Sequence, residues 1–531
     1  MERLAGRVIL LWGAKRHALA LLAGALGALA LPPYGFFAAL FISFTLLVWL
    51  LDGATGDPDR GHSLGLRSSF VTGWFFGLGY FVAGLWWLGH ALLIEADEFA
   101  WALPLAVLGL PAVLALFFGL ATFLARLLWS EGVGRIAALA AGFGLAEWLR
   151  SVVATGFPWN AIGYGAMPIP LMMQSVHAIG LFGVTTLSVF VFSAPALLGT
   201  RKAVVPGLAI ASALFAAHIG YGAYRLLEPL HAAETAREIT VRLVQPVIDQ
   251  AKKLENGDRA EIFNKHLSLS ALPVEPGAKR PDIIVWPETS IPFILTENPD
   301  ALASIADMLE EGQVLVTGAV RSEEQGPGQP PRYYNSVYVI DDKGQILTAS
   351  DKVHLTPFGE YVPYEDILRR IGFDNLIGLP GGFSAGADRS MLGLPDGMKL
   401  YPLICYEVIF PDEMKGDWAQ ANAVLNITND AWFGQTPGPY QHFLQARIRA
   451  VENGLPVVRG ANNGISAVID DRGRIISGLS LDAQGAEDAT ISIDSVSNRD
   501  NFSRSRNFWL IFAVVAMGAL ISRMGFIQGK N

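Results

Sequence analysis

Long apolar runs dominate the first 228 residues, and one more lies close to the C-terminus. They cover residues 18–31, 36–51, 70–93, 103–129, about 136–153, 181–199, 203–224 and 508–521. Most approach the roughly 20 residues that a helix needs to cross a bilayer, although the first two are shorter. The pattern predicts a membrane domain over residues 1–228 with seven transmembrane helices. An eighth transmembrane helix is predicted in the C-terminal segment, residues 506–531.

The basic residues in the short connections fall on one side of these eight predicted spans. They are Arg3, Arg7, Lys15, Arg16, Arg60, Arg67, Arg126, Arg135, Arg201, Lys202, Arg523 and Lys530. The opposite connections are poor in basic residues, and residues 95–100 are acidic. Because cytoplasmic loops of membrane proteins carry the excess of Lys and Arg, both termini are predicted to be cytoplasmic. Residues 229–505 are then expected on the far side of the membrane.

Residues 229–505 follow a different pattern, in which short strand-like runs alternate with helical ones. Strand-like runs cover 238–246, 281–288, 312–320, 399–407, 422–430 and 454–463, and helical runs cover 258–272, 298–311 and 441–453. Several strand-like runs are continuously apolar, which is typical of strands that are buried on both faces. This alternation predicts a separate α/β domain.

Composition narrows the classes of function that this chain can have. Hydrophobic residues make up 52% of the chain and charged residues 16%, against roughly 25% charged in a typical soluble domain. The net charge is −9, and no basic tract is long enough to suggest nucleic-acid binding. Cys405 is the only cysteine, so neither a disulfide within the chain nor a cysteine-based zinc site explains it.

Ionisable and polar residues gather where the predicted strands end. Glu288 closes one run, Cys405 closes a second, and Asn429 and Asp430 close a third. In α/β sheets the loops at strand ends assemble binding and catalytic sites over a rigid scaffold. Taken singly, each residue has an ordinary structural explanation. A lone cysteine after an apolar run, for example, is usually an inert buried hydrophobe.

Three short segments together carry a family resemblance. "WPETSIP", "DKVHLTPFGEYVP" and "ICYE" contain Glu288, Lys352 and Cys405 in that order, and they resemble the nitrilase, or carbon–nitrogen hydrolase, superfamily. The segment "TNDAWFGQTPGPYQHFLQARIRAVENGLPVVRGANNGISAVID", the segment "TGFPWNAIGY" and the eight-span layout are similar to the apolipoprotein N-acyltransferase family of the bacterial inner membrane. The resemblance covers nearly the whole chain.

This resemblance implies a fold and a reaction. The fold is an αββα sandwich that faces the periplasm and is attached to a multi-pass helical membrane bundle. The reaction moves an acyl chain from a membrane phospholipid, through a thioester on Cys405, to the α-amine of diacylglyceryl-cysteine on an apolipoprotein. No cofactor, metal ion or nucleic acid is expected to take part, and a monomer is expected.

The family's catalytic residues carry over by position. Glu288, Lys352 and Cys405 match its triad, and Glu360, Tyr406 and Glu407 match the residues that support it. Glu288 is expected to take the thiol proton, and Lys352 to stabilise the oxyanion together with the backbone N–H after Cys405. Lys352 is also expected to favour the thiolate. The family often has a tryptophan in the pattern Q-x-x-I-x-Q-x-x-K-W, where this chain has Leu254.

Two other functions stay open from the sequence. A membrane-anchored amidohydrolase would use the same triad with water as the acyl acceptor. A transporter or scaffold with an inactive domain would not use the triad at all. Separately, Glu147 and Arg150 lie one helical turn apart in a predicted span, and this spacing favours a structural ion pair.

Overall fold

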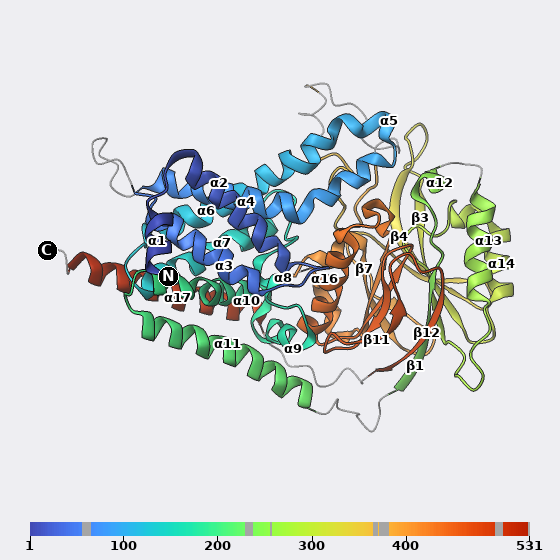
Figure 1. Cartoon of the computed structure of the whole chain (residues 1–531). Helices are drawn as coiled ribbons and strands as arrows, with labels where there is room; N and C mark the ends of the chain where they lie inside the picture. Colours follow the sequence, from blue (N-terminus) through green and yellow to red (C-terminus); the bar gives the residue numbers. More distant parts are fainter. Residues whose placement is uncertain are drawn as a thin grey trace. The chain divides into compact units, whose positions relative to one another are not determined.

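The chain forms two compact units in a computed structural model (Figure 1). The structure describes residues 1–55, 65–228, 237–254, 258–364, 370, 382–411, 413–493 and 503–528. The first unit comprises residues 1–228, 436–444 and the C-terminal helix, and the second comprises the intervening chain apart from 436–444. Each unit is described separately below.

The first unit is a bundle of helices. Its longer helices are α1 (Glu2–Ile9), α2 (Gly13–Gly27), α3 (Ala38–Asp52), α4 (Leu66–Leu85), α6 (Leu110–Leu127), α7 (Val133–Val152), α10 (Ser175–Ser193), α11 (Val204–Leu227) and α17 (Arg504–Gln528). Short helical segments connect several of them, namely η1 (Ala28–Ala30), η3 (Trp86–Leu93), α5 (Ala96–Phe99), η4 (Ala100–Ala102), η5 (Leu105–Gly109), α8 (Ile162–Gly165), α9 (Pro170–Met173) and η6 (Ala194–Gly199).

Helices occur at all eight predicted spans, but they differ in length and polarity. Within the described residues, five helical stretches are long and apolar enough to cross a membrane: Leu66–Leu93, Ala96–Leu127, Ser175–Gly199, Val204–Leu227 and Arg504–Gly525. Helices α2 and α3 have only 15 residues each. Helix α7 has 20 residues but includes the ionisable residues Arg135, Glu147 and Arg150. Eight spans therefore stay a prediction.

The ionisable pair predicted in α7 is present and buried. Glu147 and Arg150 form an ion pair whose side chains have no exposed surface. Arg150 also donates a hydrogen bond to the carbonyl oxygen of Trp159 at 2.9 Å. The prediction of a structural ion pair is confirmed, and the pair ties α7 to the segment that follows it.

The second unit contains two six-stranded sheets. The first sheet has the order β12-β1-β2-β3-β4-β5, and the second has the order β11-β10-β9-β8-β7-β6. The strands are β1 (Arg237–Gln245), β2 (Ile283–Val285), β3 (Val314–Glu323), β4 (Arg332–Asp341), β5 (Ile346–Asp351), β6 (Leu392–Gly393), β7 (Lys399–Ile404), β8 (Ala423–Thr428), β9 (Val457–Ala461), β10 (Ser466–Ile469), β11 (Ile475–Leu479) and β12 (Gly485–Ile493).

Each sheet has a parallel centre with antiparallel edges. Strands β1, β2 and β3 run parallel in the first sheet, as do β7, β8 and β9 in the second. The remaining neighbours pair antiparallel. Apolar side chains of both sheets form one buried cluster, which includes Val241, Val316, Leu400 and Leu425. The continuously apolar runs in the sequence are thus strands with a buried inner face.

Helices cover the outer face of the first sheet. Side chains of α13 (Arg259–Ser270) and α14 (Pro299–Met308), among them Phe263 and Ile305, form a second apolar cluster with Leu315 of β3 in this sheet. Helix α16 (Pro437–Asn453) divides between the units: residues 436–444 group with the first unit and its later residues with the second. In the second unit, Arg447 of α16 donates to the carbonyl oxygen of Gly473 at 2.9 Å.

Candidate active site

The three residues predicted from the sequence as a triad lie at the ends of three strands of the second unit. Glu288 lies three residues after β2, Lys352 directly follows β5, and Cys405 directly follows β7. Glu288 and Lys352 are buried, and Cys405 is partly exposed. The first two residues come from one sheet and the third from the other, so the packing of the two sheets brings them together.

Lys352 lies between two carboxylates. Its Nζ is 2.8 Å from Glu360 Oε2 and 3.5 Å from Glu288 Oε1. The side-chain amide of Asn335 donates to both carboxylates, at 2.7 Å to Glu288 and 2.8 Å to Glu360. Burial alone would lower the pKa of Lys352, but Glu360 and then Glu288 outweigh it and raise that pKa. Lys352 is therefore a fixed cation at neutral pH.

The backbone around Glu288 is held by direct contacts. Its Oε2 accepts a hydrogen bond from the backbone N–H of Asn429 at 2.9 Å. The N–H of Ser290 donates to the carbonyl oxygen of Gly318 at 2.9 Å. A Cβ on Gly318 would lie 2.7 Å from the Cα of Glu288, so only glycine allows β3 to approach this turn so closely.

Cys405 occupies a backbone conformation that is unusual for a residue other than glycine. Its φ is +50°, and such strain is often found at functional turns. The Thr428 hydroxyl lies 3.2 Å from the Cys405 sulfur and 3.0 Å from Asp430 Oδ1. The hydroxyl has one proton, so it donates to only one of these two partners at a time.

The pKa of Cys405 is shifted in the opposite direction to the shift that Lys352 alone would cause. Burial, and then the nearby charge of Glu288, raise the pKa of Cys405, while Lys352 opposes them. The ammonium does favour the thiolate, as expected, but the other two effects outweigh it. The resting group is therefore the neutral thiol, and a base must take its proton during nucleophilic attack.

A buried ion pair supports the turn after β8. Arg459 is 2.7 Å from Asp430 Oδ2, and neither side chain has exposed surface. Arg459 also donates to the side-chain oxygen of Asn426, whose amide donates to the carbonyl oxygen of Leu403 at 2.7 Å. This network links β7, β8 and β9 beneath the thiol.

Glu407 connects the loop after Lys352 to the turn at Cys405. Its carboxylate accepts hydrogen bonds from the N–H groups of Val353 at 2.9 Å, His354 at 3.0 Å and Ile404 at 2.7 Å. Arg389 pairs with the same carboxylate at 2.5 Å. Through these contacts Glu407 bridges the loop after Lys352 and the turn at Cys405.

Tyr406 lies in an aromatic cluster beside that loop. Its ring centroid is 5.8 Å from His354 and 5.2 Å from Phe410, edge-on in both cases. His354 also lies 3.4 Å from Glu413 through Nδ1. His354 thus both packs against aromatic rings and forms a polar contact, and Tyr406, next to the thiol in the chain, belongs to the same cluster.

Sequence reasoning passed over several residues of the site. Asn335 is a buried polar residue beside Tyr334 in strand β4, which was the available signal. Thr428 and Arg389 carry no such signal in the sequence, because the residues that they contact are distant along the chain. Burial lowers the pKa of Lys253 to about 8, and the charge of Glu288 opposes this shift, so a second basic side chain lies near Glu288.

Leu254, which stands where the family often has a tryptophan, is the last residue of α12 (Gln250–Leu254). The side chain of Leu254 lies outside the described residues. The same helix contacts the site through Gln250, whose side-chain oxygen accepts a hydrogen bond from Asn429 at 2.7 Å. Asn429 is also the residue whose backbone N–H binds Glu288, so α12 is connected to Glu288 through Asn429.

The fold and the strand-end residues define a carbon–nitrogen hydrolase domain joined to a helical domain. A model of the carbon–nitrogen hydrolase family matches residues 240–499, and a model of the apolipoprotein N-acyltransferase N-terminal domain matches residues 23–194. An amidase from Nesterenkonia sp. of known structure aligns over 51% of this chain and 96% of its own, with 20% identity and a TM-score of 0.36.

Full-length relatives identify the family more narrowly. Apolipoprotein N-acyltransferase from Allorhizobium ampelinum is 66% identical over 531 residues and covers 100% of both chains. The protein of the same name from Rhizobium rhizogenes is 66% identical over 533 residues, again over 100% of both chains. The chain belongs to the apolipoprotein N-acyltransferase family, which confirms the resemblance stated from its motifs.

Proposed function

We propose that this protein transfers an acyl chain from a membrane phospholipid to the N-terminal α-amine of a diacylglyceryl apolipoprotein. The observation that carries the proposal is the ammonium of Lys352 between two carboxylates, with the strained Cys405 as nucleophile. Family membership supports the choice of acyl acceptor.

The first half-reaction forms a thioester. Sγ of Cys405 attacks the carbonyl carbon of the phospholipid ester while the Glu288 carboxylate takes the thiol proton. The negative charge on the carbonyl oxygen is stabilised by Lys352 and by the backbone N–H after Cys405. The ester C–O bond then breaks, and Glu288 returns its proton to the departing alkoxide, which leaves as a lysophospholipid.

The second half-reaction transfers the acyl chain to the amine. The α-amine attacks the thioester carbonyl, and Glu288 takes a proton from the nitrogen. The C–S bond breaks, an amide forms, and the sulfur regains a proton from Glu288. Asn335 binds Glu288 and Glu360, and it holds the carboxylates beside Lys352 through both steps.

The apolar first unit suits this pair of substrates. Removing one acyl chain from a membrane into water costs about 0.8 kcal/mol per CH₂, so a site at the membrane surface avoids a large cost. We place the chain in a bacterial inner membrane with both termini cytoplasmic and the second unit in the periplasm. This orientation follows from the Lys and Arg distribution of the loops.

Mass analysis of the peptide that contains Cys405 tests this reaction. Protein purified in detergent is incubated with phospholipid labelled in its acyl chain. We expect the Cys405 peptide to gain one acyl chain, which leaves when a diacylglyceryl lipopeptide with a free α-amine is added and appears as an amide. Cys405→Ala should acquire no label.

Other outcomes contradict the proposal. Release of labelled fatty acid in water, without lipopeptide, would show an amidohydrolase-like reaction instead. Acyl label that persists in Cys405→Ala would rule out this residue as the nucleophile. If folded wild-type protein acquires no label, the experiment supports neither the transferase reaction nor the hydrolase reaction.

A further inference from the structure

Helix α11 approaches the rest of the first unit very closely at two points. A Cβ on Gly207 would lie 2.1 Å from Leu197 Cδ1, and one on Gly222 would lie 1.8 Å from the carbonyl oxygen of Leu171. Glycine is required at Gly222, where the neighbour is backbone that has little freedom to move. At 1.5 Å per residue the two glycines are about 22 Å apart along the helix. Helix α11 is therefore held to the bundle near both of its ends.

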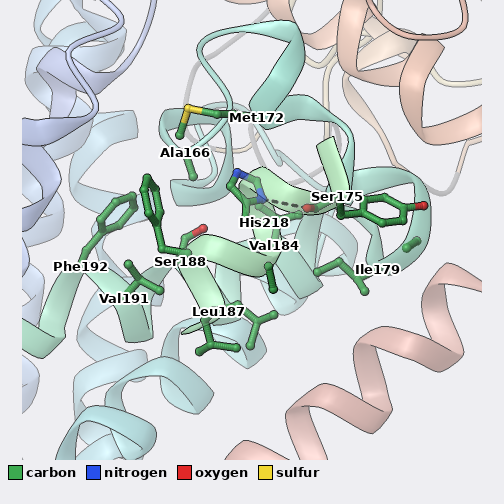
Figure 2. A pocket seen from close by; sticks show the side chains of 15 residues that line it. Ala166, Met172, Ser175, Ile179, Val184, Leu187, Ser188, Val191, Phe192 and His218 are labelled. Atoms are coloured by element: carbon green, nitrogen blue, oxygen red, sulfur yellow. Dashed lines mark hydrogen bonds between the residues drawn. The ribbon is translucent and has the colours of Figure 1, made fainter. Parts of the chain in front are cut away.

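An apolar hollow of about 260 Å³ lies between α10 and α11, between these two contacts (Figure 2). Helix α10 is interrupted at Gly180, where φ is +67°. One end of the hollow is lined by Val191 and Phe192 of α10 and by Leu214 and Phe215 of α11. Val191 and Phe192 lie about four helical turns after Ser175 along α10, whereas Leu214 and Phe215 lie about one turn before His218 along α11.

The other end of the hollow is polar. Ser175, at the start of α10, lies 2.8 Å through Oγ from His218 Nδ1, as Figure 2 shows. Tyr221, also in the lining, lies 3.4 Å through its hydroxyl from His177 Nδ1. None of the fifteen described residues that line the hollow is Asp, Glu, Lys or Arg. The polar end thus offers hydroxyl and imidazole groups to ester or phosphate oxygens and has no carboxylate to bind an ammonium.

We infer that the hollow holds one acyl chain of a glycerophospholipid, with the ester and phosphate at the end formed by Ser175, His218 and Tyr221. The lack of a carboxylate favours a phospholipid over the amine-bearing lipopeptide. This inference rests on the membrane location that is part of the proposed function, and it adds a lipid site whose residues are separate from the Cys405 site.

Physical arguments support this occupant. Both helices belong to stretches that are long and apolar enough to span a membrane, and only 11% of the α11 stretch is buried within the protein. An apolar cavity does not retain water, and one of about 150 Å³ already accommodates benzene. A larger apolar hollow that opens between helices in a bilayer is accessible to lipid chains and gains dispersion contacts when one fills it.

Photo-crosslinking with a matched pair of variants tests the inference. Full-length protein in lipid nanodiscs is supplied with a glycerophospholipid that carries a diazirine at the end of one acyl chain, and crosslinked peptides are mapped by mass spectrometry. Ala217→Phe fills the hollow, whereas Ala216→Phe adds the same ring to an exposed neighbour outside the lining. Ser188→Leu, a smaller change in the lining, is the second variant if Ala217→Phe does not fold.

We expect crosslinks at Val191, Leu214 and Phe215, reduced at least about fivefold by Ala217→Phe or Ser188→Leu and unchanged by Ala216→Phe. Two outcomes would show that the probe labels only bulk lipid and would overturn the inference. One is equal labelling of the exposed residues Val205 and Ile210, and the other is an equal effect of both alanine substitutions. Preferential labelling of the hollow by a diazirine lipopeptide would overturn the choice of phospholipid. The experiment also works in Cys405→Ala, so its result is independent of thioester formation.

Discussion

At the residue scale, one carboxylate has two opposite effects on the same thiol. Glu288 raises the pKa of Cys405, after burial, and so keeps the sulfur protonated at rest. The same carboxylate is the base that we propose takes the proton during attack. A neutral resting thiol is less open to alkylation and oxidation than a thiolate, while the nearby base still allows catalysis.

Glu288→Gln should therefore change thiol reactivity and acyl transfer in opposite directions. Loss of the negative charge lowers the pKa of Cys405, so iodoacetamide should alkylate Cys405 faster at pH 8 in the variant than in wild type. Acyl transfer should fall by about 100- to 10,000-fold because the base is lost. The chain has one cysteine, so alkylation is read directly from the intact mass.

Glu297→Gln, an exposed substitution of the same type, is the control and should change neither rate. Across a pH series, wild-type alkylation should still be rising above about pH 8.5, the ordinary thiol pKa. Slower alkylation in Glu288→Gln would contradict the electrostatic account.

At the element scale, the close approach of two strands decides where the base lies. Strand β3 contacts the turn after β2 at Gly318, whose N–H donates to the carbonyl oxygen of Pro287 at 3.2 Å. Thr289 in that turn has a φ of +46°. The position of the Glu288 carboxylate therefore depends on a glycine in a different strand, about thirty residues later in the sequence.

Gly318→Ala should displace this turn. The new Cβ would lie 2.6 Å from the Thr289 nitrogen and 2.7 Å from both Glu288 Cα and Pro287 O, and backbone atoms cannot move aside as a flexible side chain would. We expect a loss of stability of about 1–3 kcal/mol and a loss of acyl transfer of about 100-fold. Thermal unfolding and thioester formation measure the two effects.

Gly393→Ala in β6 is the matched control, because no atom lies within 4 Å of its added Cβ. It should retain both stability and activity. Wild-type activity in folded Gly318→Ala would show that the turn can shift without harm, contrary to the expected tight coupling.

At the scale of the whole molecule, an apolar helical unit accompanies an α/β unit that contains the candidate site. The α/β unit begins and ends next to helices of the first unit, at α11 and α17. In the proposed eight-span topology, both ends of the chain lie on one side of the membrane and the α/β unit lies on the other. That topology is part of the proposal that the site takes its acyl chain from a membrane phospholipid.

Protease accessibility tests this topology. The exposed turn between β3 and β4 accepts a specific protease site between Gly326 and Pro327. We expect cleavage in spheroplasts, where the periplasmic face is accessible, and protection in sealed inverted vesicles. A second site appended to the C-terminus should behave in the opposite way. Cleavage of both sites from the same side would show that α17 does not cross the membrane and would contradict the eight-span topology.

Local pattern alone was enough to predict much of this protein. The apolar runs predicted the helices of the first unit, and the alternation after residue 229 predicted the α/β unit, because burial imposes periodicity on short segments. Glu288, Lys352 and Cys405 were selected because each follows a strand within a recognisable motif. Their assignment as a catalytic triad stays a prediction, as do the supporting roles of Glu360, Tyr406 and Glu407.

Contacts between residues distant in sequence were decided only by the tertiary structure. Asn335 shared between two carboxylates, and Thr428 beside the sulfur, depend on how two sheets pack. The direction of the Cys405 pKa shift depends on burial and on several charges together. The size of each effect depends on distances that the sequence does not show. The two kinds of domain and the candidate residues follow from the chain alone, because these depend on local periodicity and motif. The structure decided the balance of forces at the thiol and the hollow beside α11, because both depend on distances between separate elements.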